Sequence, residues 1–124
     1  MNIHRASPVG DDWGEVRAEL TRGFEMARAA ALAEQSFVFV VHHDDLLGKR
    51  GAGNAMVATG LLSAARTAAL EGVRKGWAAN VLAYDDESDP KIVTEWAERL
   101  AVDSLGVTGE IIRTGSSHLG KALP

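Results

Sequence analysis

The stretch that decides the fold is Ser36-Phe-Val-Phe-Val-Val41, a run of β-branched and aromatic residues with no alternating polar positions. Such a run is typical of a strand that is covered on both faces, as in a parallel sheet. The residues before it predict a helix over 11–33, because Trp13, Leu20 and Phe24 recur at helical spacing. We therefore expect a helix to lead into a buried strand.

The residues that follow continue the alternation of helices and strands. They predict a helix over 54–75, a strand over 79–84, a helix over 90–102 and a strand over 110–114. This order indicates one α/β domain over residues 1–124, a truncated Rossmann-like fold of three parallel strands with long helices on both faces. The outer edge of the first strand would then show unpaired backbone groups unless another segment covers it.

Length and composition exclude several classes of protein. The chain has 124 residues, a formal net charge of −4 and no cysteine. One small domain fits this length, and disulfide scaffolds and thiol catalysis are excluded. The slightly negative net charge provides no basic surface for nucleic acid or anionic lipid, so we expect neither as a partner. No apolar run is long enough to span a membrane, and the first residues lack the apolar core of a signal peptide, so we expect a cytoplasmic protein.

The cluster His42-His43-Asp44-Asp45 directly follows the first predicted strand. Ligands of α/β proteins bind at this end of a strand, where imidazoles and carboxylates could hold a metal or move a proton. Adjacent residues, however, point in different directions. A solvated loop is therefore the favoured interpretation, and we predict no metal site.

Three glycines, Gly48, Gly51 and Gly53, lie between a strand and a helix and suggest a dinucleotide-binding turn. The fingerprint for that site needs a tight turn that leads straight from strand to helix. Here a longer segment intervenes and the third glycine is missing. A flexible loop is favoured, and we predict no bound cofactor.

Several sequence segments and their order along the chain resemble the short-chain dehydrogenase/reductase superfamily, and most of all its 3-oxoacyl reductase branch. The residues that carry the resemblance are Asp12-Trp-Gly-Glu-Val-Arg-Ala-Glu-Leu20, Phe37-Val-Phe-Val-Val41, Arg74-Lys-Gly-Trp-Ala-Ala-Asn-Val81 and Val107-Thr-Gly-Glu-Ile-Ile112. The resemblance covers most of this chain but only the second half of the usual family domain. The family's first half, with its nucleotide-binding glycine turn, has no counterpart here.

The resemblance also implies where the family's catalytic residues would fall. The tyrosine position is Asn54, the lysine position is Ala58, the helix asparagine position is Glu19, and the serine position is His42 or, with one gap moved, Val41. Tyr84 is the only tyrosine, and no lysine stands four residues after it. Neither Asn54 nor Ala58 can donate a proton near neutral pH. We predict that this chain does not run the family's reaction by itself.

The resemblance implies that the surfaces by which family members assemble are kept. In the family, the two long helices pair with their copies in a neighbouring subunit, and the last helix and strand make a second contact. Small residues four apart on the second long helix also suit a close helix contact. The predicted interface residues are Leu20, Phe24, Gly60, Ala64, Ala68, Gly72, Trp96 and Ile112.

Three hypotheses for the function follow. The first is a non-catalytic subunit that assembles with, and supports or modulates, a full-length NAD(P)-dependent reductase of 3-oxoacyl or similar carbonyl substrates. The second is a homo-oligomeric binding or scaffold module. The third, which we favour least, is an enzyme with a new site around Glu19, His42, His43 and Asp44.

Overall fold

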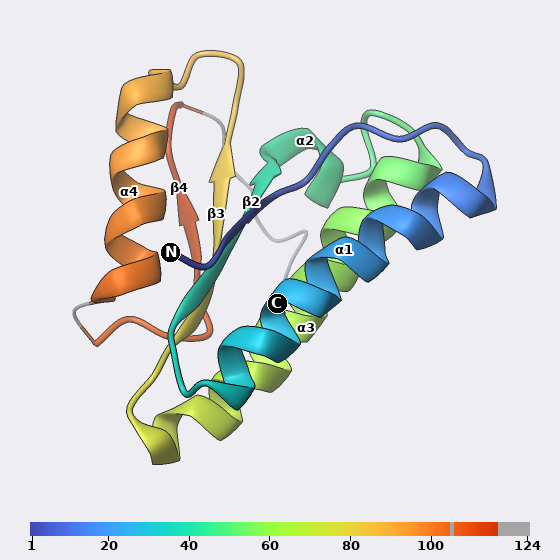
Figure 1. Ribbon diagram of the computed structural model, residues 1–124. Coiled ribbons are helices and arrows are strands. Elements are labelled where there is room, and N and C mark those ends of the chain that lie inside the picture. Colours follow the sequence, from blue (N-terminus) through green and yellow to red (C-terminus); the bar gives the residue numbers. More distant parts are fainter. Residues whose placement is uncertain (105, 117–124) are drawn as a thin grey trace.

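The sheet at the centre of the protein has four parallel strands in the order β1-β2-β3-β4. A computed structural model describes residues 1–104 and 106–116, and Figure 1 shows the arrangement. The strands are β1 (Ile3–Arg5), β2 (Phe37–His42), β3 (Ala79–Tyr84) and β4 (Ile111–Arg113). All of β2 is buried, as its unbroken apolar sequence predicts.

Helices cover both faces of the sheet. The long helices α1 (Trp13–Leu32) and α3 (Ala52–Lys75) lie side by side on one face, and α4 (Pro90–Val102) lies on the other (Figure 1). Alternate residues of the central strands feed two cores. Phe37, Phe39 and Val41 pack under α1 and α3, whereas Val38 and Val40 pack under α4. The predicted α/β, Rossmann-like class is therefore confirmed.

The number of strands was predicted wrongly, because the sheet has four strands and not three. The additional strand, β1, runs parallel to β2 with Ile3 opposite Val38 and Arg5 opposite Val40. The backbone N–H of Ala6 continues the pairing by donating to the carbonyl of Val40 at 2.9 Å. The edge of β2 that was expected to be open is thus covered. Three residues, of which two are polar, carry no strand pattern that the sequence could reveal.

The remaining elements lie close to their predicted ranges, with one difference. A loop was expected from His42 to the second long helix, but this segment holds the short helix α2 (His43–Leu46), and α3 begins at Ala52. Three helix ends are capped: Asp12 and Asp89 accept bonds at the starts of α1 and α4, and Gly76 ends α3 at a φ of 82°. None of the helices described is long and apolar enough to cross a membrane.

Candidate functional site

Glu19, to which the resemblance assigns the superfamily's helix asparagine position, is fully buried on α1. Its Oε2 accepts bonds from His4 Nε2 at 2.8 Å and from the backbone N–H of Ser7 at 3.1 Å. Its Oε1 accepts two bonds from the guanidinium of Arg22, at 3.1 and 2.6 Å. Burial alone raises the pKa of Glu19, but the bonds from Ser7, Arg22 and His4 outweigh it and hold the pKa below its ordinary value of 4.5. The carboxylate is therefore ionised at neutral pH and fastens β1 to α1.

Asn54, to which the resemblance assigns the superfamily's tyrosine position, fixes the segment between β1 and α1. Its Oδ1 accepts from the backbone N–H of Val9 at 2.8 Å, and its amide nitrogen donates to the carbonyl of Arg50 at 2.9 Å. One residue earlier, the N–H of Gly53 donates to the Asp11 carboxylate at 3.1 Å. The bonds from Val9 to Asn54 and from Gly53 to Asp11 hold the start of α3 against the segment that leads into α1.

Ala58, to which the resemblance assigns the superfamily's lysine position, lies one turn further along α3 and is 1% exposed. Its methyl group is part of the apolar core under α1 and α3. It has no group that could donate a proton or shift the pKa of a neighbour.

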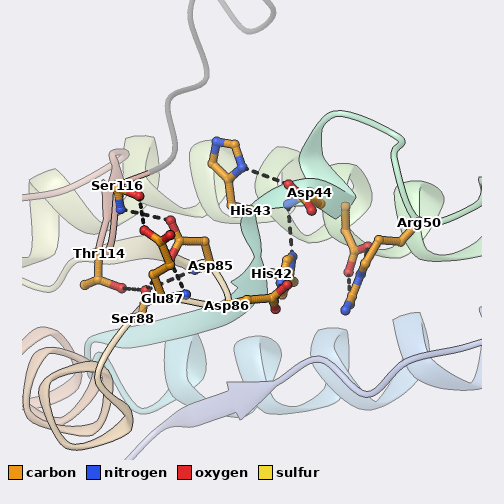
Figure 2. A network of polar contacts seen from close by, with 11 residues as sticks. His42, His43, Asp44, Arg50, Asp85, Asp86, Glu87, Ser88, Thr114 and Ser116 are labelled. Atoms are coloured by element: carbon orange, nitrogen blue, oxygen red, sulfur yellow. Dashed lines mark hydrogen bonds and ion pairs between the residues drawn. The ribbon is translucent and has the colours of Figure 1, made fainter.

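His42 ends β2 and uses both ring nitrogens (Figure 2). Its Nδ1 accepts from the backbone N–H of Asp44 at 3.1 Å, which caps α2. This acceptor role places the proton of the neutral ring on Nε2, which donates to Asp86 Oδ1 at 2.9 Å. The ring is 4% exposed and packs edge to face on Tyr84. Val41, the alternative position for the family's serine, is a buried core residue.

The side chains that follow His42 diverge, as expected for adjacent residues. His43 is buried and contacts the Asp44 carboxylate at 3.3 Å through Nδ1, while its Nε2 has no hydrogen-bond partner among residues 1–104 and 106–116. Asp45 binds the Arg50 guanidinium with two bonds of 2.8 Å, and this pairing raises the pKa of Arg50. Within the described residues, no three His, Asp or Glu side chains come together as metal ligands. The solvated loop that the sequence favoured is instead a largely buried turn.

Asp85 opens the acidic run Asp85-Asp-Glu-Ser-Asp89 after β3, a pattern that by itself favours a solvated turn. Asp85 is 6% exposed, and its carboxylate accepts from the N–H of Glu87 at 2.9 Å, from Ser88 Oγ at 3.2 Å and from the N–H of Ser116 at 2.9 Å. Thr114 bonds Ser88, and Ser116 bonds Glu87 (Figure 2). This network joins the end of β4 to the turn before α4. Residues 117–124 lie outside the described residues.

The predicted interface residues lie in three settings. Leu20 packs on Gly60, where an added Cβ would come within 2.9 Å of its Cδ2, and Gly72 packs against Trp77. Ala64 and Ala68 are half-buried beside the core, and Ile112 is half-buried on β4. Phe24 and Trp96 remain 43% and 40% exposed. Part of the small-residue ridge on α3 therefore serves the contact with α1 of the same chain.

Comparison with solved structures shows the fold. A short-chain dehydrogenase from Mycobacterium smegmatis superposes with a TM-score of 0.71 at 23% identity, covering 94% of this chain and 58% of its own. The TT0495 protein from Thermus thermophilus gives a TM-score of 0.71 at 20% identity, with 90% and 66% covered. A short-chain dehydrogenase/reductase family oxidoreductase from Brucella ovis, in complex with a partially ordered NAD, gives 0.62 at 16%, with 90% and 61% covered.

Comparisons by sequence gave no match to a family model and no match to a curated protein. The chain spans less than two thirds of the length of the structures to which it is similar. The structural likeness nevertheless covers nearly the whole of the present chain, in agreement with the resemblance noted in its sequence. The protein therefore has a partial short-chain dehydrogenase/reductase fold.

Proposed function

We propose that this chain is a non-catalytic, short-chain dehydrogenase-like subunit. It assembles with a full-length NAD(P)-dependent reductase of 3-oxoacyl or similar carbonyl substrates, and it supports or modulates that partner. The proposal rests on one observation: the residues that the resemblance places at the superfamily's catalytic positions have structural roles in this chain. Glu19, His42 and Asn54 hold the protein's own backbone and side chains together, and Ala58 is part of the core.

The chemistry at these positions supports the proposal. Carbonyl reduction needs a proton donor that is free to face the substrate. The amide of Asn54 does not ionise near neutral pH, and the Glu19 carboxylate is an acceptor with four bonds already made. His42 has committed both ring nitrogens. Recruiting any of these groups for catalysis would break a bond that holds the fold.

An apolar surface on the paired long helices supports assembly. Leu20 of α1 contacts Gly60 of α3. Phe24 stands one turn after Leu20 and Met56 one turn before Gly60, so the two lie on either side of this contact. Phe24 is 43% and Met56 is 46% exposed. Exposed large apolar side chains mark candidate surfaces for protein partners. A standard interface buries about 800 Å² on each partner, an area that two such helices can provide.

A co-purification experiment tests this proposal. The chain is co-expressed with a tagged full-length reductase encoded beside it, and retention on the tag is measured together with the rate of carbonyl reduction. We expect the chain to be retained and to change the partner's rate. Phe24→Asp should abolish retention, whereas Glu25→Gln on the same exposed helix should not. Separate elution with the partner's rate unchanged would contradict the proposal.

The same exposed surface also favours a second candidate, a homo-oligomeric binding or scaffold module. Two copies of the α1–α3 pair could cover each other's Phe24 and Met56. Light scattering on the purified chain distinguishes the two candidates. A stable homodimer or homotetramer that ignores the reductase would support the second candidate and count against the first.

A further inference from the structure

A pocket of about 350 Å³ opens at the carboxyl ends of β1, β2 and β3, beside the first turn of α4. This volume lies within the range of roughly 300–1,000 Å³ that is usual for small-molecule sites. The carboxyl ends of parallel strands are also the edge at which α/β proteins bind ligands. None of the interactions described so far occupies this space.

One wall of the pocket carries a guanidinium that lacks an ionic partner. Arg5, at the end of β1, donates from one terminal nitrogen to Thr94 Oγ1 of α4 at 3.3 Å. No ion pair joins Arg5 to a carboxylate in the part of the chain that the structure describes. A guanidinium has five N–H donors in a rigid fork, and this geometry matches a carboxylate. Arg5 is thus steadied by Thr94 and can still bind an anion.

Asp86, which also lines this pocket, follows β3 and carries a carboxylate. Its Oδ1 accepts the bond from His42 Nε2, which fixes the side chain, while the side chain remains 89% exposed. Its Oδ2 makes no hydrogen bond to the described residues. Arg50 is near enough to interact with the charge of Asp86, but its guanidinium bonds Asp45, so the Oδ2 of Asp86 remains available to a cationic group of a ligand.

The remaining lining is mixed. Val40 of β2, Val93 of α4, Ala6 and Pro90 form its apolar part. Tyr84, Asp85 and Ser88 also line the pocket, and the Asp85 carboxylate already accepts bonds from Glu87, Ser88 and Ser116. An apolar part beside separate positive and negative groups suits a dipolar molecule that carries a short hydrocarbon part. A molecule with a single charge would satisfy only one of the two groups.

We propose that this pocket binds a small zwitterion of the aliphatic α-amino acid class, with its carboxylate on Arg5 and its ammonium group on Asp86. This inference concerns the isolated chain and does not rest on assembly with a reductase. It gives the chain a ligand-binding role in addition to the proposed role as a subunit.

Calorimetric titration of the purified chain tests the inference, with L-alanine, L-valine and L-leucine as probes. We expect saturable binding of at least one probe. Analogues that keep one charge, such as 4-methylpentanoate and 3-methylbutylamine for leucine, should bind at least about tenfold more weakly, because a charge-assisted hydrogen bond exceeds the energy of a tenfold change. Absence of binding by all three amino acids, or equal affinity for a singly charged analogue, would overturn the inference.

Substitutions test whether Arg5 and Asp86 bind the two charged groups of the ligand. Arg5→Gln and Asp86→Asn should each raise the dissociation constant of the amino acid by about tenfold or more. Lys91→Gln and Glu95→Gln, at exposed positions of α4 that do not line the pocket, are the controls and should leave affinity unchanged. Equal affinity of the Arg5 and Asp86 variants and the wild type would contradict the assignment. Because Arg5 and Asp86 are both exposed, circular dichroism should show both variants folded.

Discussion

His4 on β1 donates its Nε2–H to the buried Glu19 carboxylate on α1 at 2.8 Å. Ser7, just after β1, bonds the same carboxylate oxygen through its backbone N–H. These two contacts attach β1, an edge strand of only three residues, to the long helix α1. Two-residue and three-residue pairings contribute little by themselves, so the Glu19 contacts explain how β1 keeps its place beside β2.

Replacing Glu19 with alanine should destabilise the protein by roughly 2–3 kcal/mol, because the Ser7 N–H and the largely buried His4 ring lose their acceptor, whereas Arg22, with a side chain 59% exposed, can bond to water instead. His4, Arg22 and the Ser7 N–H would all lose their acceptor. Urea unfolding measures the change. Glu25→Ala, at an exposed position of the same helix, is the control and should cost under about 0.5 kcal/mol. Equal losses for the two variants would refute a structural role for Glu19.

The pH dependence of stability should carry the signature of Glu19. Its pKa in the folded protein lies below the ordinary value of 4.5, so the folded state binds this proton less readily than the unfolded state. The stabilisation is complete above the unfolded pKa and is lost as the pH falls below 4.5 and through the folded pKa. Unfolding free energies of the wild type and Glu19→Gln, measured from pH 6 to pH 3 in the same buffer series, should therefore converge towards acid pH. A constant difference across this range would show that the charge of Glu19 is not responsible.

The strands that could be predicted are those whose own sequence is apolar enough to require that the strand be buried. Phe37-Val-Phe-Val-Val41 is apolar throughout, and a strand covered on both faces is the arrangement that hides all of it. β1 could not be predicted in this way, because Ile3, His4 and Arg5 form a strand through their contacts with Val38, Glu19 and Thr94. Partners that stand far away in the sequence supply its stability, and no local pattern records them.

The candidate site follows the same rule. The position of His42 at the end of a strand was readable from the sequence, because the strand itself was readable. The burial of Asp85 was not, since Ser116 lies 31 residues away and an acidic run normally faces solvent. The one local signal was Ser88, three residues after Asp85, a spacing at which short polar side chains bond in turns.

Gly53→Ala and Gly60→Ala on α3 should differ strongly in their effect. A Cβ on Gly53 would overlap the carbonyl oxygen of Gly10, a backbone atom that cannot move alone. A Cβ on Gly60 would lie 2.9 Å from Leu20 Cδ2, the end of a flexible side chain. We expect thermal unfolding to show a loss of roughly 1–3 kcal/mol for Gly53→Ala. For Gly60→Ala we expect a value near zero, because alanine gains about 1 kcal/mol of helix propensity over glycine. A larger loss at Gly60 would contradict this ranking.

The neighbours Asp85 and Asp86 offer a matched pair of carboxylates that differ in burial. Asp85→Ala would leave three donors without an acceptor, those of Glu87, Ser88 and Ser116, and should cost roughly 2–3 kcal/mol of unfolding free energy. Asp86→Ala removes a side chain that is 89% exposed and leaves one donor, the Nε2–H of His42, without its acceptor, so it should cost less, about 1 kcal/mol. Hydrogen exchange should localise the first effect, with faster exchange at the amides of Glu87 and Ser116. If both substitutions proved equally mild, the bonds to Asp85 would not hold β4 to the turn before α4.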